Sequence, residues 1–204
     1  MGMNEKCMDM NEKWVMADDA NDYLSADEYI DFGDKVIQAL ARQLKGNNDK
    51  ETIENTFKFV RDKITHSRDA HREETPAKAS DVLQLKTGLC WAKSNLLAAL
   101  LRANEIPCGI MYQRLPWNHG TAFCIHALNA VCFNNCWIRI DARGNRPGVD
   151  AQFDPPLEKV AFDANRPGCI DYQNIYAHPS PKLMNLLETS ESLSQVCADM
   201  PDTF

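Results

Sequence analysis

Three residues in the sequence have side chains that can together perform nucleophilic chemistry. Cys90 stands near the start of "GLCWAKSNLLAALLR", His126 lies in "IHALNAVCF" and Asp141 lies in "CWIRIDARGN". A cysteine is activated when an adjacent base holds its proton, and that base needs a partner that orients it. The sequence offers Cys90 as nucleophile, His126 as base and Asp141 as orienting carboxylate. The competing interpretation is a buried core cysteine with two structural polar residues.

Residues 90–103 are predicted to form a buried helix that begins at Cys90. Their apolar side chains cover nearly the whole circumference, which is typical of a helix enclosed by other elements, and Pro107 ends it. The first turn of a helix offers free backbone N–H groups and the positive end of the helix dipole, and both favour a thiolate. The nearby Gly88 lets the backbone turn tightly or approach a substrate closely.

The hydrophobic pattern after Pro107 has a period of two and predicts three strands, at 108–115, 122–133 and 136–143. Asn134 and Asn135 join the last two strands as a tight hairpin turn. With this turn, His126 and Asp141 become diagonal neighbours on one face, roughly 7–8 Å apart at the backbone and within side-chain reach. A three-residue loop would instead put Asp141 on the opposite face.

Helices are predicted on both sides of this core. Asp34 can cap a helix with the apolar stripe Val36, Ile37, Leu40 and Leu44, and a second helix lies within 48–64. A short turn at 80–85 and a C-terminal helix at 181–196 follow. The order predicts an α+β fold in which N-terminal helices and a buried central helix pack on an antiparallel sheet. We expect a loose N-terminal tail over 1–24 and a single domain over 25–204.

The composition argues against several classes of partner. The chain has 204 residues, a net charge of −7 and no long basic run, so nucleic acid is not an expected partner. No apolar run is long enough to span a membrane, and the first 20 residues lack the apolar core of a secretory signal. These features predict a cytoplasmic protein without membrane contact. No feature of the sequence points to an oligomeric state.

The eight cysteines have irregular spacing, which indicates thiols in a reducing compartment rather than a disulfide framework. Four residues could suggest a zinc site: Cys124, His126, Cys132 and Cys136. Structural zinc sites usually use two pairs of ligands, each with two to four residues between its members. The pair Cys124-Ile-His126 is too closely spaced for that pattern, so no metal site is expected.

At these residues the chain resembles the transglutaminase-like superfamily, which has a papain-like fold. The pattern there is Gly-x-Cys opening a buried helix, then Arg-x-x-x-Ile-Pro, a strand histidine, and a Trp shortly before a strand Asp. Here it reads "GLCWAKSNLLAALLRANEIPCG", "IHALNAVCF" and "CWIRIDARGN", and the upstream "FKFVRDKITHSRD" and "ASDVL" also resemble bacterial members. The likeness covers roughly residues 50–175. It implies that Cys90, His126 and Asp141 form a catalytic triad.

The resemblance further implies acyl transfer through a thioester on Cys90, without a cofactor, on a peptide, protein or small amide substrate. Leu89 stands where crosslinking transglutaminases carry Gln, and Leu128 and Arg143 also differ from the usual Trp and Thr. These departures favour hydrolysis of an amide or peptide bond over glutamine–lysine crosslinking. Two alternatives stay open: a protein-glutamine amine transferase, and a non-catalytic protein-binding module on the same fold.

Several further residues have a functional and a structural interpretation. The Cys90 backbone N–H is the natural first donor to an oxyanion. Gln84, six residues before Cys90, stands at the offset of the oxyanion glutamine of papain, and the competing interpretation is an exposed turn residue. His66 has a hydrogen-bonded structural role or substrate contact as its two interpretations, and His119 is a candidate for the cleft rim. Structural roles are favoured for four other residues: Trp91, Trp137, Arg102 and Arg143.

Overall fold

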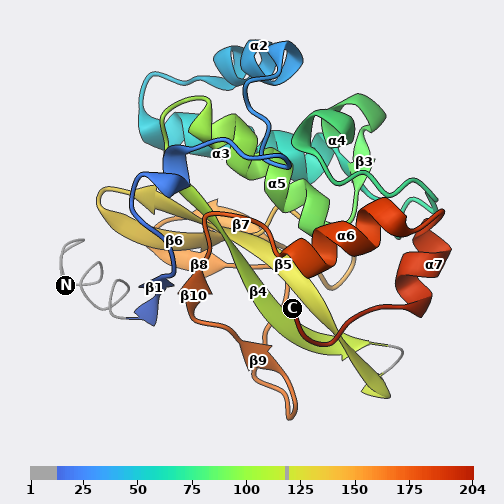
Figure 1. Ribbon diagram of the computed structural model, residues 1–204. Coiled ribbons are helices and arrows are strands. Elements are labelled where there is room, and N and C mark those ends of the chain that lie inside the picture. Colours follow the sequence, from blue (N-terminus) through green and yellow to red (C-terminus); the bar gives the residue numbers. More distant parts are fainter. Residues whose placement is uncertain (1–12, 118–119) are drawn as a thin grey trace.

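The computed structural model describes residues 13–117 and 120–204 (Figure 1). The helices are α2 (Lys35–Leu44), α3 (Asp49–Lys63), α4 (Ala79–Leu85), α5 (Cys90–Arg102), α6 (Pro181–Thr189) and α7 (Leu193–Ala198), with a 3-10 turn, η1, at Asp22–Leu24. The strands are β1 (Val15–Met16), β2 (Thr65–His66), β3 (Thr87–Gly88), β4 (Cys108–Trp117), β5 (Ala122–Phe133), β6 (Cys136–Ile140), β7 (Gln152–Asp154), β8 (Leu157–Lys159), β9 (Ile170–Asp171) and β10 (Asn174–Ile175). The predicted α+β architecture is confirmed.

Helix α5 occupies the centre of the molecule, as its all-apolar circumference predicts. It contacts α2, α3 and α4 on one side and strands β4 and β5 on the other (Figure 1). Every residue of α5 after Cys90 is buried. No side chain caps the start of the helix at Leu89, so the first-turn N–H groups remain available to other partners.

The first two helices begin at polar caps, of which Asp34 was predicted. The Asp34 carboxylate accepts hydrogen bonds from the backbone N–H groups of Val36 and Ile37, at 2.7 and 3.1 Å. The Asn48 side chain accepts one from Glu51 at 3.0 Å. Both satisfy N–H groups that the first turn leaves unpaired. One position of the expected stripe is wrong, because Val36 is 64% exposed and the buried side of α2 is formed by Ile37 with Ala41.

The main sheet has the antiparallel order β6-β5-β4-β9. Asn134 and Asn135 have φ values of 52° and 60°, the left-handed conformations that a two-residue type I′ turn requires. The predicted hairpin register is confirmed, since Phe133 pairs with Cys136 and the pairing continues to Asn129 with Ile140. Asp141 is therefore the first residue beyond the end of β6.

The two faces of the sheet pack against different parts of the chain. Residues on one face join the main core around α5: Ile125, Ala127, Val131, Ile138 and Ile140. Residues on the other face, including Leu128 and Trp137, form a smaller cluster with Trp14 and Tyr23. This second cluster involves a segment that the sequence analysis treated as a tail.

The expectation of a loose tail over 1–24 is wrong for residues 14–24. Trp14 is 4% exposed and Tyr23 is fully buried, and β1 pairs in parallel with β10. The Tyr23 hydroxyl donates a hydrogen bond to the carbonyl of Ile175 at 2.7 Å. Residues 1–12 lie outside the described residues. The prediction of a tail followed from the acidic composition of the segment. It did not take account of Trp14 and Tyr23, whose aromatic side chains bury apolar surface against the sheet.

The C-terminal part contains two helices where one was expected over 181–196. The chain leaves α6 at Ser190, and Ser192 then caps α7 by accepting a hydrogen bond from the Gln195 N–H at 3.2 Å. Both helices pack on the main core. Within the part of the chain that the structure describes, no helix has the length and apolar character needed to cross a membrane.

Candidate active site

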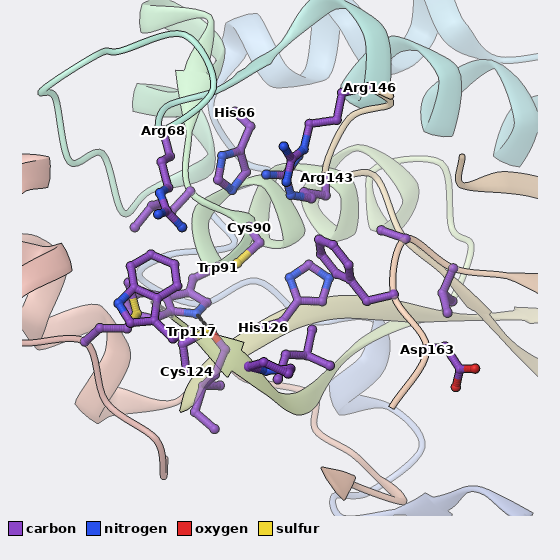
Figure 2. A pocket seen from close by; sticks show the side chains of 18 of the residues that line it. His66, Arg68, Cys90, Trp91, Trp117, Cys124, His126, Arg143, Arg146 and Asp163 are labelled. Carbon is purple, nitrogen blue, oxygen red and sulfur yellow. Dashed lines mark hydrogen bonds between the residues drawn. The ribbon is translucent and has the colours of Figure 1, made fainter. Parts of the chain in front are cut away.

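Cys90, His126 and Asp141 come together at one end of the sheet. The Nε2 atom of His126 lies 2.8 Å from the Oδ2 atom of Asp141, and both side chains are buried. The second ring nitrogen, Nδ1, is left for Cys90, whose thiol is close enough to the same imidazole for His126 to lower its pKa. Figure 2 shows the Cys90 sulfur beside His126, at the start of α5. The structure thus brings the three predicted residues into one chain of contacts.

Trp91 explains why a tryptophan follows the cysteine at the start of the helix. Its indole Nε1–H donates a hydrogen bond to the carbonyl of Ile125 at 2.8 Å. Ile125 immediately precedes His126 on β5. The bond therefore ties the first turn of α5 to the strand that carries the imidazole. Trp91 is buried and has the structural role expected for it.

The short parallel pair β2–β3 holds the segment before Cys90. The N–H of Ser67 donates to the carbonyl of Gly88 at 3.1 Å, and the N–H of Thr65 donates to the carbonyl of Lys86 at 2.9 Å. Gly88 is buried, a Cβ atom at this position would make only ordinary contacts with α4 and α5, and its φ does not lie in the left-handed region. The approach to Cys90 is fixed by backbone pairing.

Asp141 is held by backbone donors as well as by the imidazole. Its Oδ1 atom accepts a hydrogen bond from the Arg143 N–H at 3.0 Å, and Oδ2 accepts one from the Ala161 N–H at 3.1 Å. A carboxylate that accepts several hydrogen bonds is stabilised in its charged form. Asp141 is therefore ionised and fixed in orientation toward His126.

The three groups shift one another's proton affinity. Burial raises the pKa of the Asp141 carboxyl, but the charge of His126 and the hydrogen bonds it accepts outweigh burial and hold that pKa below its ordinary value. Burial lowers the pKa of His126, but Asp141 and the Cys90 thiolate outweigh burial and raise it to about 10. Burial raises the pKa of the Cys90 thiol, whereas the adjacent imidazolium brings it below its ordinary value. The site favours a thiolate–imidazolium pair.

Cys90 and His126 line a cavity of about 650 Å³. Cys124 lines the same cavity, but burial raises its thiol pKa to about 12. Cys90 differs because it is in contact with the imidazole, so two cysteines in one cavity have opposite electrostatic environments. Both are free thiols.

Lys93 holds backbone segments next to the site and was not identified as a candidate from the sequence. Its Nζ atom donates to the carbonyl of Ile64 and, at 2.9 Å, to the carbonyl of Arg143. Burial lowers the pKa of Lys93 to about 7, against the opposing effect of Asp141. Lys93 could have been recognised from the sequence, because it is a charged residue within a helix that is otherwise apolar on all sides. Such a charge needs hydrogen-bond partners in the core.

Gln84 does not reach the cavity of Cys90, so its assignment as an oxyanion donor is wrong. It is exposed on α4 and lines a separate groove beside α2. Lys86, with φ of 58°, ends α4 in the left-handed conformation and redirects the chain before Cys90.

The other candidates fall into separate groups. His66 lines the cavity, whereas His119 lies outside the described residues. Arg102 is buried and donates to three backbone carbonyls, at Ser25, Cys108 and Ala177, which is a structural role. Among the residues that the structure describes, no three His, Cys, Asp or Glu side chains gather as metal ligands would.

Comparison with known proteins places this chain in a family. The model of the transglutaminase-like superfamily matches residues 38–142, slightly more than half of the chain, and the matched region includes Cys90, His126 and Asp141. A comparison with curated proteins found no match.

Comparison with solved structures found similar chains at low sequence identity. A candidate cysteine protease from Cytophaga hutchinsonii is similar with a TM-score of 0.50 and 18% identity, over 64% of this chain and 45% of that chain. The periplasmic domain of TgpA from Pseudomonas aeruginosa has a TM-score of 0.45 and 16% identity, over 62% of this chain and 48% of that chain. This chain thus matches less than half the length of either protein.

Proposed function

The chain belongs to the transglutaminase-like superfamily, and from that premise we propose that it is a cysteine-dependent acyl-transfer enzyme. The reaction is hydrolysis of an amide or peptide bond through a thioester on Cys90. The observation that carries the proposal is the contact of one imidazole with both the Cys90 thiol and the Asp141 carboxylate, at a cavity. A module that only binds a partner has no need for a thiol whose pKa is lowered by an adjacent imidazolium.

The first half of the proposed reaction forms the thioester. The Cys90 thiolate attacks the carbonyl carbon, a C–S bond forms and the carbonyl electron pair moves to oxygen. The Cys90 N–H, at the uncapped start of α5, donates to this oxyanion. When the C–N bond breaks, the His126 imidazolium gives its proton to the departing amine. Asp141 holds the ring in position and stabilises its positive charge.

The second half returns the enzyme to its starting state. His126, now neutral, takes a proton from a water molecule while the water oxygen attacks the thioester carbon. The C–S bond breaks, the thiolate is released beside the new imidazolium, and a carboxylic acid leaves. No cofactor is required. An amine in place of water would give a new amide, which is the alternative of a protein-glutamine amine transferase.

Peptides, proteins and small amides are the proposed substrates. The proposal places the protein in the cytoplasm, although the expectation that the cysteines are all thiols is wrong for Cys136, which is disulfide-bonded. It includes no contact with nucleic acid or with a membrane.

The proposal is tested by trapping the acyl-enzyme with short peptide thioesters, which are reactive acyl donors. We expect an adduct on Cys90, detected by intact and fragment mass spectrometry, that water releases as an acid. Propylamine added as a second acceptor distinguishes hydrolysis from amine transfer by the product formed.

The control variants use the two cysteines of the cavity. Cys90→Ala is expected to fold and to form no adduct, whereas Cys124→Ala is expected to behave as the natural protein. Absence of Cys90 acylation in a folded protein would favour the non-catalytic binding module. Unchanged acylation of Cys90→Ala would show that the nucleophile is another residue.

A further inference from the structure

The cavity at Cys90 is rich in positive charge although the molecule as a whole is acidic. Four arginines are among its described lining residues: Arg68, Arg143, Arg146 and Arg166. Asp163 is the single carboxylate among those residues, while the whole chain carries a net charge of −7. A concave site with one sign of charge concentrates ligands of the opposite sign. The charge of this cavity is therefore a property of the site and not of the surface in general.

Two of these arginines share one carboxylate outside the cavity lining. The Arg143 guanidinium donates to both oxygens of Asp69, at 2.6 and 3.0 Å. Arg146 lies 3.7 Å from the same carboxylate. Asp69 thus pairs closely with Arg143 and at longer range with Arg146.

Arg68 is an exposed side chain with no carboxylate partner among the described residues. Its guanidinium lies 3.9 Å from the centroid of the Trp117 ring, close enough for a cation–π contact. The backbone beside it is also held, because Ser67 is buried and its hydroxyl is 3.1 Å from that of Thr87. A guanidinium that already lies on an aromatic ring can bind a carboxylate through its edge without leaving that ring.

The direction of the reaction assigns the two sides of Cys90 to different parts of a substrate. Figure 2 shows Arg68 and Trp117 on one side of Cys90 and His126 on the other, with Asp163 beyond His126. The departing amine must lie near His126 in order to receive its proton. The acyl part of the substrate then extends away from His126, toward Arg68.

His66 is a second polar side chain in this region, and one of its ring nitrogens has no hydrogen-bond partner. Its side chain lines the cavity between Arg68 and Arg143 in the view of Figure 2 and is only 8% exposed. The Nδ1 atom is buried and has no hydrogen-bond partner. Burial, with the positive charge of Arg143, holds the pKa of His66 well below its ordinary value, so the ring is neutral. A neutral imidazole can hydrogen-bond to a polar substrate group without adding charge.

We propose that the acyl part of the substrate carries a carboxylate, which binds Arg68 on the Trp117 side of the cavity. This assignment rests on the proposed acyl-transfer function and specifies its substrate class. The guanidinium presents a planar pair of N–H donors that matches a carboxylate, while the face of the guanidinium stays on the indole.

The proposal is tested with two vinyl sulfones that place a peptide on the acyl side of Cys90, acetyl-Glu-Gly-vinyl sulfone and acetyl-Gln-Gly-vinyl sulfone. They have the same shape and differ in one charge. We expect Cys90 to react about tenfold faster with the Glu compound, as a charge-assisted contact predicts. The rate of the Glu compound should fall toward that of the Gln compound as salt concentration rises. Adduct formation is followed by intact mass spectrometry.

Arg68→Gln should reduce the ratio of the two rates to about one while Cys90 stays reactive toward iodoacetamide. Arg114→Gln is the matched control. The Arg114 guanidinium also lies over an aromatic ring, 3.7 Å from the centroid of Phe123, but it is paired with Asp202 and does not line the cavity. We expect this control to keep the preference for the Glu compound.

Equal rates for the two compounds in the natural protein would overturn the proposal, as would a preference that Arg68→Gln leaves unchanged. These outcomes can be distinguished from failure of the proposed function. In that case Cys90 would react with iodoacetamide no faster than Cys197, whatever the peptide compounds do.

Discussion

The backbone N–H of Arg143 donates a hydrogen bond to the Asp141 carboxylate at 3.0 Å, although the two residues lie beyond the end of β6. The chain is held there because the Arg143 carbonyl accepts from Lys93 and the Arg143 guanidinium binds Asp69. The orientation of Asp141 therefore depends on a turn that is anchored at three points. The side chain of Arg143 anchors this turn, and its backbone contacts the carboxylate.

Arg143→Ala should separate these two contributions. We expect it to lower the free energy of unfolding by about 1–3 kcal/mol, because it removes a largely buried bidentate partner of Asp69, which is itself partly exposed. The N–H that binds Asp141 remains, so Cys90 should stay more reactive toward iodoacetamide than Cys197. Urea unfolding measures the first effect. Arg146→Ala, which removes an exposed contact with the same carboxylate, is the control and should change stability little.

Asp141→Asn should preserve the shape of the site and remove its charge. Asp141 is the strongest influence that raises the pKa of His126, so the imidazolium becomes less stable and the Cys90 pKa rises. We expect the rate of thioester formation to fall by about a thousandfold or more, as when the orienting carboxylate of a catalytic triad is neutralised. Stopped-flow acylation with a peptide thioester measures the rate. A variant with near-natural acylation would exclude an orienting role for Asp141.

Trp91→Phe should loosen the connection between α5 and β5. The substitution removes the indole N–H that binds the Ile125 carbonyl and leaves that buried acceptor unpaired. We expect a loss of about 1–3 kcal/mol of stability together with slower labelling of Cys90. Unfolding curves and labelling rates test the two effects separately. If stability falls and Cys90 labelling does not change, the bond has no role in positioning the nucleophile.

Lys93→Met should cost more stability at pH 9 than at pH 6. Because folding lowers the Lys93 pKa to about 7, the unfolded chain binds more protons than the folded chain between that pH and the ordinary lysine value. The stability of the natural protein therefore rises with pH in this window, by about 1.4 kcal/mol for each unit of pKa difference, and the variant lacks this rise. Thermal unfolding of both proteins at several pH values measures it. If Lys93→Met lowers the free energy of unfolding equally at both pH values, the predicted pH dependence is wrong.

The relation between His126 and Asp141 was predictable from the sequence because a strand has a strict two-residue period. Once Asn134 and Asn135 are accepted as a two-residue turn, the faces of both strands are determined. Helix α5 was predictable for a similar reason, since its apolar circumference requires burial on every side. Both predictions depend only on residue types and on the repeat of apolar residues along one strand or helix.

The charged side of the cavity was not predictable, because it is formed by irregular segments. Arg68 lies in a turn after β2, and Trp117 lies at the end of β4, 49 positions further along the chain. No periodic pattern relates two such positions, and each arginine taken alone has the character of a solvated residue. The error at Gln84 has the same origin, since its direction depends on how α4 ends at Lys86 and not on its distance from Cys90 in the sequence.

The most direct test of the account is the rate of iodoacetamide labelling of each cysteine between pH 5 and 9, measured by mass spectrometry. The Cys90 pKa lies below its ordinary value, whereas burial raises the pKa of Cys197 and, to about 12, that of Cys124. We expect Cys90 labelling to persist as the pH falls, while labelling of Cys124 and Cys197 declines about tenfold per pH unit. In His126→Gln, Cys90 should lose this advantage. A parallel decline of all three cysteines in the natural protein would contradict the account.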